Sequence, residues 1–474
     1  MLFNSFEFLI FLPIVFLIYW LFKDNLRIQN IIILISSYIF YGWWDYRFLA
    51  LILISTIIDY TIGLGIQETK SKNHKKILLL TSIVCNLGLL MSFKYFNFFI
   101  DSWVDLLNGI GYRTENSWTL NIILPVGISF YTFQTMSYTI DIYRNKLKPT
   151  RDFISFASFV SFFPQLVAGP IERATNFLPQ ILTKRTYNKD QVLQGVRLII
   201  WGLFKKVVIA DSLGPIVDEI FETSETQGGG TLWLGAIYFA FQIYCDFSGY
   251  SDIAIGTAKL FGFELMSNFK FPFFSRNIGE FWRRWHISLS TWFRDYLYIP
   301  IGGSKNGKSK AIRNILIIFI VSGFWHGANW TFIAWGTFHA ILFLPSFLSN
   351  SNRKFIGTVA FNKKLPTLKE VFFILRTFIL VTIGWVFFRS ETLTDALTYL
   401  GQMSNPLKFT ILPNIKLFFY MILLLILEWN MRHDERNPLI FKQKPLRIIV
   451  LMLIITLIIL NFGRNPQQFI YFDF

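Results

Sequence analysis

Two of the five histidines lie in sequence contexts that could support proton transfer. His326 lies in FWHGANWTFIAWG (residues 324–336), directly after an apolar run, and His286 lies in EFWRRWHISLSTWF. A neutral imidazole has a pKa of about 6.5 in model peptides, so it can take the proton of a hydroxyl group as that group attacks a carbonyl carbon. Gly327 beside His326 leaves space for another group to approach. The residue types therefore point to a general base.

The turn that carries His326 is predicted to be sunk inside the protein. The segment from Asn314 to Ser349 is barely long enough for two membrane crossings at about 1.5 Å of rise per residue. Two interpretations of His326 stay open at this point: a general base inside a tunnel, or a structural histidine that caps the turn. The other three histidines are expected to take no part in chemistry, two in charged loops (His74, His433) and one packed in an apolar span (His339).

Several polar residues lie within long apolar stretches. Examples are Asp59, Gln134, Asp141 and the cluster Asp246, Ser248 and Asp252 in QIYCDFSGYSDIAIG. A charge at the centre of a bilayer costs about 2.5 kcal/mol or more, so such residues usually face water or a partner inside a helix bundle. Hydrogen bonding between helices accounts for any one of them. The cluster in QIYCDFSGYSDIAIG favours the wall of a cavity.

Motifs of two common hydrolase classes are missing from the chain. It has neither H-E-x-x-H nor G-x-S-x-G, so it matches neither zinc peptidases nor serine hydrolases of the nucleophile-elbow type. Its two cysteines, Cys85 and Cys245, both lie in apolar runs, which argues against a disulfide framework and against a thiolate zinc site. We expect no bound metal ion.

The segment GGSKNGKS (residues 302–309) matches the phosphate-loop pattern G-x-x-x-x-G-K-S. A nucleotide hydrolase needs this loop between a buried strand and a helix of a soluble parallel sheet. Here a predicted interfacial helix precedes the loop and a membrane span follows it, which argues against nucleotide hydrolysis. A smaller role stays open, because backbone amides with Lys305, Lys308 and Lys310 could hold the phosphates of a cytoplasmic donor such as coenzyme A.

The elements that would position these residues are membrane helices. Hydrophobic residues make up 53% of the 474 residues and aromatic residues 19%, which fits no soluble globular class. Roughly eleven to thirteen runs are candidate spans or re-entrant helices for a hydrocarbon core of about 30 Å. We predict an all-α integral membrane protein with one polytopic domain (residues 1–474), whose first apolar run is a retained anchor.

Positive and negative charges alternate along the chain. Lys and Arg number 45 against 29 Asp and Glu, a net charge of +16. The basic excess lies in KDNLR, QETKSKNHKK, YRNKLKPTR and residues 270–313, whereas residues 101–115 and 218–225 are acidic. Because cytoplasmic loops carry the excess of Lys and Arg, we expect the N-terminus outside the cytoplasm. These charges lie in short loops beside spans, so membrane lipids are the expected surroundings and nucleic acid is not an expected partner.

One amphipathic segment is expected at the cytoplasmic membrane surface. Asn277 and Glu280 have the spacing of a helix N-cap with an acidic third residue, and proline and glycine end the pattern near residue 300. We predict one helix between these limits, on which Trp282, His286 and Phe293 fall near one another. Its mixture of tryptophan and arginine favours the membrane interface.

Seven segments occur in an order that resembles the membrane-bound O-acyltransferase (MBOAT) family. They are LPVGISFYTFQTMSYTIDIYR, FFPQLVAGPIER, GLFKKVVIADSL, FQIYCDFSGYSDIAIG, FWRRWHISLSTWFRDYLYIPIGG, FWHGANWTFIAWG and GWVFFRSETLTDAL. The likeness is to the bacterial branch typified by the alginate O-acetylation membrane protein and extends to the C-terminal FIYFDF. It implies a multi-helix bundle around a central tunnel in the bacterial cytoplasmic (inner) membrane.

The resemblance also implies an activity, which is acyl transfer from a cytoplasmic thioester to an extracytoplasmic acceptor. It places the principal catalytic histidine at His326 and the second at His286. No bound cofactor is implied; acetyl-CoA or another acyl thioester is the donor, with its phosphates near Lys305 and Lys308. The acetyl group would then lie beside Asp246 and Ser248, and the groups that could orient it or the imidazole are Tyr244, Trp325 and Asn329.

The implied acceptor is a hydroxyl of an exported polysaccharide, alginate-like or peptidoglycan. The sequence has no large extracytoplasmic domain that could hold a polymer, so we expect a separate extracytoplasmic acetyltransferase as partner protein. The alternative function is that of a transporter or channel for a lipid-linked or soluble substrate, in which His326 and the intramembrane carboxylates relay protons. Inverted repeats would favour that alternative, and the sequence shows none.

Overall fold

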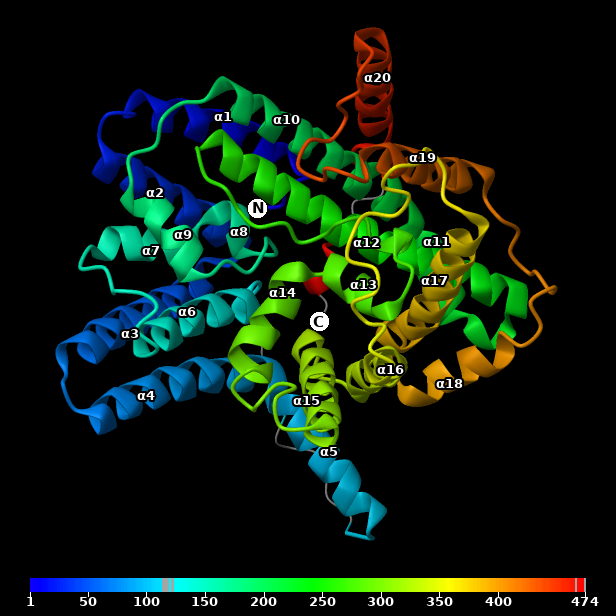
Figure 1. Cartoon of the computed structure of the whole chain (residues 1–474), viewed down its shortest axis with the longest axis horizontal. Helices are drawn as coiled ribbons and strands as arrows, with labels where there is room; N and C mark the ends of the chain where they lie inside the picture. The colour runs from blue at the N-terminus through cyan, green and yellow to red at the C-terminus, as the bar shows by residue number, and fades with distance from the viewer. Residues whose placement is uncertain (113–118, 121–122, 465–466, 473–474) are drawn as a thin grey trace. The chain divides into compact units, whose positions relative to one another are not determined.

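The computed structural model of the chain describes residues 1–112, 119–120, 123–464 and 467–472 (Figure 1). Within these residues every regular element is helical, as predicted. Five helical stretches are long and apolar enough to cross a bilayer: Leu26–Glu68, Lys72–Gly109, Trp330–Leu348, Leu368–Arg389 and Lys444–Asn461. Other predicted spans coincide with helices that are shorter or more polar. One further apolar run of the sequence, which we also predict as a span, begins at Trp118, outside the described residues. The chain is an all-α, multi-pass membrane protein.

Two compact units are distinguished within the chain. Unit 1 comprises residues 1–192 and 258–265, and unit 2 comprises residues 193–257 and 266–474. Every predicted site residue belongs to unit 2. The prediction that the whole chain forms one domain stays a prediction.

Unit 1 is a helical bundle held together partly by polar contacts between helices. Its elements are α1 (Phe6–Leu21), α2 (Leu26–Asp45), η1 (Tyr46–Phe48), α3 (Leu49–Glu68), α4 (Lys72–Leu90), η2 (Met91–Tyr95), α5 (Phe96–Gly109), α6 (Ile128–Tyr143), α7 (Phe153–Ser161), α8 (Phe163–Leu166) and α9 (Ala174–Leu182). Asp59 on α3 is buried and accepts hydrogen bonds from Ser82 (2.5 Å) and Asn86 (2.8 Å) of α4. Gln134 on α6 donates to the carbonyl oxygen of Phe159 on α7. For Asp59 and Gln134, hydrogen bonding between helices is confirmed.

Unit 2 contains the remaining helices. They are α10 (Lys189–Leu203) from residue 193, η3 (Phe204–Ala210), α11 (Asp211–Glu222), η4 (Ser224–Thr226), α12 (Gly229–Leu260) up to residue 257, η5 (Pro272–Phe274), α13 (Ile278–Arg284), α14 (Ile287–Phe293), η6 (Arg294–Tyr298), α15 (Lys308–His326), α16 (Trp330–Leu348), α17 (Leu368–Arg389), α18 (Leu393–Gln402), α19 (Ile415–Met431), α20 (Lys444–Asn461) and η7 (Ile470–Phe472). Consecutive helices α15, α16 and α17 pack on one another (Figure 1).

The predicted amphipathic helix is interrupted. Its start is confirmed, because the Asn277 side chain accepts the backbone N–H of Glu280 at 2.7 Å and α13 begins at the next residue. The prediction that the helix continues past His286 was wrong: α13 ends at Arg284, and His286 has a left-handed conformation (φ 44°, ψ 53°) before α14 begins. Trp282, His286 and Phe293 are therefore not on one continuous helix face.

Candidate active site

His326 is the last residue of α15, at the turn into α16. Two glycines let these helices approach closely: a Cβ on Gly323 would lie 2.2 Å from the carbonyl oxygen of Phe332, and one on Gly336 would lie 2.3 Å from that of Phe319. Small residues of this kind allow membrane helices to pack backbone against backbone. His326 is only 2% exposed and Gly327 is buried, whereas Ala328 and Asn329 are half-buried, so the predicted sunken position is confirmed for His326 itself.

Aromatic rings surround the imidazole of His326. Its centroid lies 5.1 Å from the ring of Trp325, 5.1 Å from Trp335, 5.4 Å from Phe388 on α17 and 5.6 Å from Tyr471. Trp325, predicted as an orienting residue, is thus in contact with the imidazole. A site enclosed by aromatic rings excludes water, which limits the hydrolysis of a reactive acyl group.

His286 is fixed by its neighbours in the break between α13 and α14. Its Nδ1 lies 3.1 Å from Oδ1 of Asn268, which also accepts hydrogen bonds from the backbone N–H and the hydroxyl of Ser288. Because this amide oxygen accepts, the Nδ1 of His286 carries the proton and its Nε2 presents a lone pair. A left-handed residue other than glycine costs about 1–3 kcal/mol, so these contacts hold a strained conformation.

The two imidazoles form one buried pair. The ring centroids of His286 and His326 lie 6.2 Å apart, and the ring of Trp325 contacts both, at 5.9 Å and 5.1 Å. Burial lowers the pKa of His286, which lies outside the five apolar spans, to about 3. The imidazole of His286 is therefore neutral at physiological pH. An imidazole with so low a pKa is a weak base, so the environment of His286 fits a positioning role better than proton transfer.

Replacing Asn268 with alanine tests how much the orientation of His286 contributes to the rate of acyl transfer. A neutral hydrogen bond contributes about 0.5–1.5 kcal/mol, so we expect acyl transfer to slow by roughly twofold to tenfold, as measured by thiol release from an acyl thioester. Ser251→Ala is the matched control, because Ser251 contacts only the amide nitrogen of Asn268. A larger loss in Ser251→Ala than in Asn268→Ala would contradict this role.

A cluster of buried charges lies beside the histidine pair. Lys206 on η3 forms ion pairs with Asp211 (2.8 Å) and Asp246 (2.7 Å), and Lys205 pairs with Asp252 (2.7 Å). These pairs form because α10 and α12 touch at two glycines: a Cβ on Gly249 would lie 2.8 Å from the carbonyl oxygen of Gly202. The carboxylates of the predicted polar cluster on α12 are therefore paired with lysines.

Asp246 also anchors the C-terminal segment. Its second carboxylate oxygen accepts the backbone N–H of Ile470 at 2.7 Å. The next residue, Tyr471, places its ring 6.4 Å from the ring of His286 and 5.6 Å from that of His326. One carboxylate thereby connects the charge cluster to a residue that contacts both histidines.

A polar cavity of about 490 Å³ adjoins this segment. Its lining includes Lys206, Asp246, Gln242, Arg389 and Ile470. Asp246 therefore does line a cavity, as predicted for its cluster. The cavity reaches the residue before Tyr471, and a continuous tunnel to His326 stays a prediction.

Two other predicted residues are bonded within the helix bundle. The hydroxyl of Tyr244 lies 2.5 Å from Oε1 of Glu428 on α19 and donates a hydrogen bond to it. Ser248 accepts a hydrogen bond from Nζ of Lys205 at 2.8 Å. Both side chains are buried, and both are engaged in contacts that hold α12 to its neighbours.

The remaining predicted residues are Asn329, in the turn that follows His326, and the two lysines near the start of α15. Asn329 caps α16 by accepting the N–H of Thr331, and its amide nitrogen donates to the carbonyl oxygen of Glu391. Lys305 and Lys308 are exposed at the start of α15, and at about 1.5 Å per residue Lys308 is roughly 27 Å along the helix from His326. The side chain of Asn329 is therefore engaged in capping α16 and in the contact with Glu391, and Lys308 lies far from the imidazoles.

Three residues of the site were missed in the sequence analysis: Asn268, Lys206 and Tyr471. Tyr471 had a usable signal, because FIYFDF follows the last apolar run and so many aromatic residues favour burial. Asn268 had none, since an isolated asparagine in a loop is common. Within the described ranges, no group of three or more His, Cys, Asp and Glu side chains is arranged to hold a metal ion.

The chain is similar to known proteins over most of its length. The model of the MBOAT, membrane-bound O-acyltransferase family, matches residues 34–390. Over 399 residues the chain is 42% identical to the probable alginate O-acetylase AlgI of Azotobacter vinelandii, which covers 84% of this chain and 76% of that protein. It is 35% identical over 434 residues to the peptidoglycan O-acetyltransferase of Helicobacter pylori, an alignment that covers 85% of this chain and 80% of that protein. It is 33% identical over 240 residues to the teichoic acid D-alanyltransferase of Streptococcus thermophilus, an alignment that covers 47% of this chain and 57% of that protein.

The family match includes the residues around which the site is built. His286, His326, Asn268 and the charge cluster all lie between residues 34 and 390, whereas Tyr471 follows that range. The match extends over more than half of the chain, and the relatives are named as enzymes that transfer acyl groups. This chain belongs to the membrane-bound O-acyltransferase family and is an acyltransferase.

Proposed function

We propose that this acyltransferase moves an acetyl group from a cytoplasmic thioester, such as acetyl-CoA, to hydroxyl groups of an envelope or exported polysaccharide. The observation that carries the proposal is the buried pair of imidazoles, His286 and His326, with ring centroids 6.2 Å apart. The relatives named O-acetylase or O-acetyltransferase match far more of this chain than the D-alanyltransferase does. This difference favours acetyl over D-alanyl as the transferred group.

In the proposed reaction, His326 takes the proton of the acceptor hydroxyl while the hydroxyl oxygen attacks the carbonyl carbon of the thioester. The C–S bond then breaks and the carbonyl group forms again. The proton passes from the imidazolium to the leaving thiolate, so the products are an oxygen ester and a thiol. His286, oriented by Asn268, positions the reacting groups beside His326.

The two ends of α15 suit the two substrates. Its first turn contains Lys308 and the loop before it contains Lys305, and here the phosphates of a donor such as coenzyme A could be held. His326 lies at the other end, beside Phe388 at the end of α17. The polar cavity at Arg389 and Asp246 is at this second end and would admit the acceptor hydroxyl.

The charge pattern supports an orientation in the cytoplasmic membrane. Basic segments flank the start of α15, so this end is assigned to the cytoplasm and the His326 end to the outside. By the same rule the N-terminus lies outside the cytoplasm. A bacterial inner membrane fits the relatives, which are named for modifying alginate and peptidoglycan.

A separate extracytoplasmic acetyltransferase is proposed to complete the reaction on the polymer. The connections of unit 2 at the His326 end are short, at residues 223–228, 327–329, 390–392 and 403–414. Connections of this length offer little surface for holding a polysaccharide chain. Membrane lipids, the acyl donor, the partner protein and the polysaccharide are therefore the proposed partners.

Ester analysis of a deletion strain tests the proposal. We expect acetate released by mild alkali from envelope polysaccharides to fall to background after deletion and to return when the wild-type gene is restored. Ester-linked D-alanine, measured in the same samples, is expected to stay unchanged. Unchanged acetate with lowered D-alanine would contradict the proposed acyl group.

An assay with purified protein distinguishes the release of thiol from the donor from the acetylation of the polysaccharide. We expect the chain alone to release thiol from acetyl-CoA only when a small hydroxyl compound is supplied to accept the acetyl group, and to leave polysaccharide unmodified until the partner is added. Acetylation of the polymer by the chain alone would contradict the need for a partner.

A further inference from the structure

The lipid-facing surface of α17 carries an arginine about two turns from the start of the helix. Arg376 is eight residues after Leu368, or about 12 Å along the helix axis. Its neighbours Phe372, Leu375 and Ile379 are 62%, 54% and 45% exposed, as expected for side chains that contact lipid. A charge at such a place is costly unless the side chain reaches a polar partner.

Protein groups supply little compensation for this charge. In the part of the chain that the structure describes, Arg376 forms no ion pair, and its guanidinium lies 5.2 Å from the ring centroid of Phe373. Lys354, in the loop before α17, lies 5.8 Å from the ring of Phe355 and likewise has no carboxylate partner among the described residues. Two cations on one surface of unit 2 are therefore open to an anionic ligand.

Both cations line the same cavity. It has a volume of about 570 Å³, and the charged residues that line it are Arg276, Lys354 and Arg376, with no carboxylate among the described lining residues. The apolar part of its wall is formed by Ile341, Leu342, Pro345 and Leu380. A hydrocarbon wall beside the positive charges of Lys354 and Arg376 matches a ligand that has both an anionic group and an aliphatic chain.

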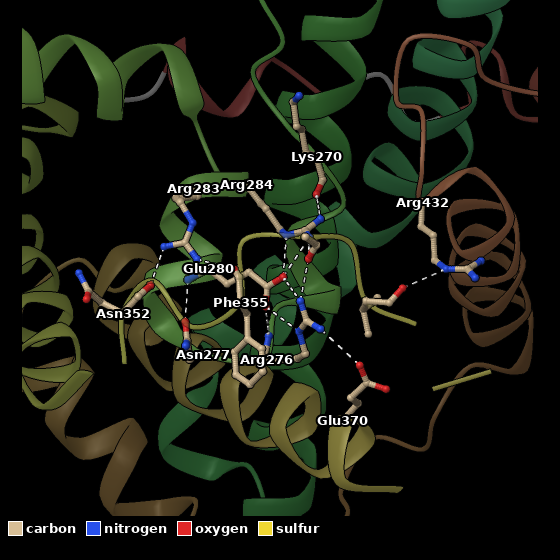
Figure 2. Close-up of polar contacts among 12 residues, drawn as sticks. Lys270, Arg276, Asn277, Glu280, Arg283, Arg284, Asn352, Phe355, Glu370 and Arg432 are labelled. Atoms are coloured by element: carbon tan, nitrogen blue, oxygen red, sulfur yellow. Dashed lines mark hydrogen bonds and ion pairs between the residues drawn. The ribbon is translucent and has the colours of Figure 1, made fainter. Parts of the chain in front are cut away.

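The wall on the α13 side is held rigidly by an ion-pair cluster (Figure 2). Arg276 pairs with Glu280 (3.0 Å) and Glu370 (3.3 Å), and its guanidinium lies 4.4 Å from the ring centroid of Phe355. Arg284 also pairs with Glu280, at 2.9 Å. The carboxylates of this cluster are thus occupied by Arg276 and Arg284, which leaves Lys354 and Arg376 to a ligand.

The loop that carries Lys354 is tied to the same helix. Arg283 donates hydrogen bonds to the carbonyl oxygens of Asn352 (2.7 Å) and Phe355 (2.6 Å), as Figure 2 shows. Lys354 lies between these two anchored residues. The cavity is therefore preformed, which lowers the ordering cost of binding a ligand.

We propose that this cavity binds an anionic phospholipid, with its headgroup phosphate between Arg376 and Lys354 and an acyl chain along Ile341, Leu342 and Leu380. Ser346 and Ser349 supply hydroxyl groups at the same cavity for the glycerol or headgroup oxygens. A lipid is favoured over a soluble phosphate compound because Ile341 in the cavity wall and Phe372 next to it are exposed apolar residues. This inference does not depend on the proposed acetyl transfer.

Native mass spectrometry of the purified full chain in mild detergent tests the proposal. Phosphatidylglycerol is added as the anionic probe and phosphatidylcholine as the zwitterionic one. We expect wild-type protein to retain phosphatidylglycerol preferentially and the double variant Arg376→Gln with Lys354→Gln to retain at least fivefold less. Arg353→Gln removes the same charge from the neighbouring exposed residue outside the cavity and is expected to leave retention unchanged.

Two substitutions at Arg376 distinguish loss of its positive charge from a general effect on folding. Arg376→Lys keeps the positive charge and is expected to retain most of the phosphatidylglycerol binding, whereas Arg376→Gln loses it. Equal binding of the two lipids, or equal binding by the wild type and the double variant, would overturn the proposal. Displacement of phosphatidylglycerol by coenzyme A at similar concentration would also overturn it, because the cavity would then be a site for the donor's phosphates.

Discussion

Replacing His326 with glutamine is expected to lower acetyl transfer by roughly 10²- to 10⁴-fold, which is the usual contribution of a general base. Glutamine has a similar size and polarity, so the turn between α15 and α16 should keep its packing, but an amide does not take up a proton near neutral pH. The loss is measured as thiol release from acetyl-CoA by purified protein supplied with a small hydroxyl acceptor, and as ester-linked acetate in cells. Protein abundance in the membrane, measured in parallel, is expected to stay normal.

His339→Gln is the matched control for this experiment. His339, on α16, is buried like His326. Its ring centroid lies 4.9 Å from that of Trp335, one of the residues that contact His326. Its conversion to glutamine is expected to change transfer by no more than a fewfold. Equal losses in the two variants would mean that aromatic packing, not proton transfer, explains the effect, and normal transfer by His326→Gln would exclude the general base.

Replacing Lys206 with methionine is expected to have the largest effect on stability. Lys206 is buried between Asp211 (2.8 Å) and Asp246 (2.7 Å), so its removal leaves two carboxylates without their shared cation. Breaking a buried ion pair in this way typically costs about 3–5 kcal/mol. The unfolding temperature of the purified protein in detergent should fall clearly, and transfer should fall as well, because Asp246 anchors the segment that contains Tyr471.

Two further variants make this prediction specific. Lys184→Met breaks an exposed ion pair with Asp24 (2.9 Å) and is expected to cost less than about 1 kcal/mol. Adding Asp211→Asn and Asp246→Asn to Lys206→Met removes the uncompensated charges and should restore part of the lost stability. A fall in unfolding temperature no larger than that of Lys184→Met would contradict a central role for the charge cluster.

The position of His326 could be predicted because local features determine it. The segment between two apolar runs is too short to leave the membrane, and Gly323 and Gly336 allow its two helices to pack tightly. The start of α13 at Asn277 was predictable for the same reason, since a cap depends on residues only three apart. The helical membrane class followed from composition and apolar run lengths.

The conformation of His286 could not be predicted from its neighbours. The sequence RRWHIS contains neither glycine nor proline, and helical periodicity continues through it. The break is stabilised by Asn268, which lies 18 residues earlier in a loop. Tertiary contacts of this kind override local helix preference, and a single sequence does not reveal them.

The pairing of Lys206 with Asp246 depends on packing that is also invisible in the sequence. The lysines and the carboxylates were each visible, but their pairing needs the backbone contact between Gly202 and Gly249. It also needs the π-helical turn η3, in which the adjacent Lys205 and Lys206 reach different carboxylates. Interruptions of this type are frequent at functional sites.

The contact of Tyr471 with both histidines has a consequence for biosynthesis. The hairpin that carries His326 leaves the ribosome well before Tyr471 is translated, and the two residues are 145 positions apart. A nascent chain already inserted in the bilayer therefore holds its imidazoles without the phenol that packs on them. The ring contacts of Tyr471 form only after the C-terminal segment packs against the histidine pair, so we expect shortened translation products that lack this segment to be inactive even when they are stably inserted.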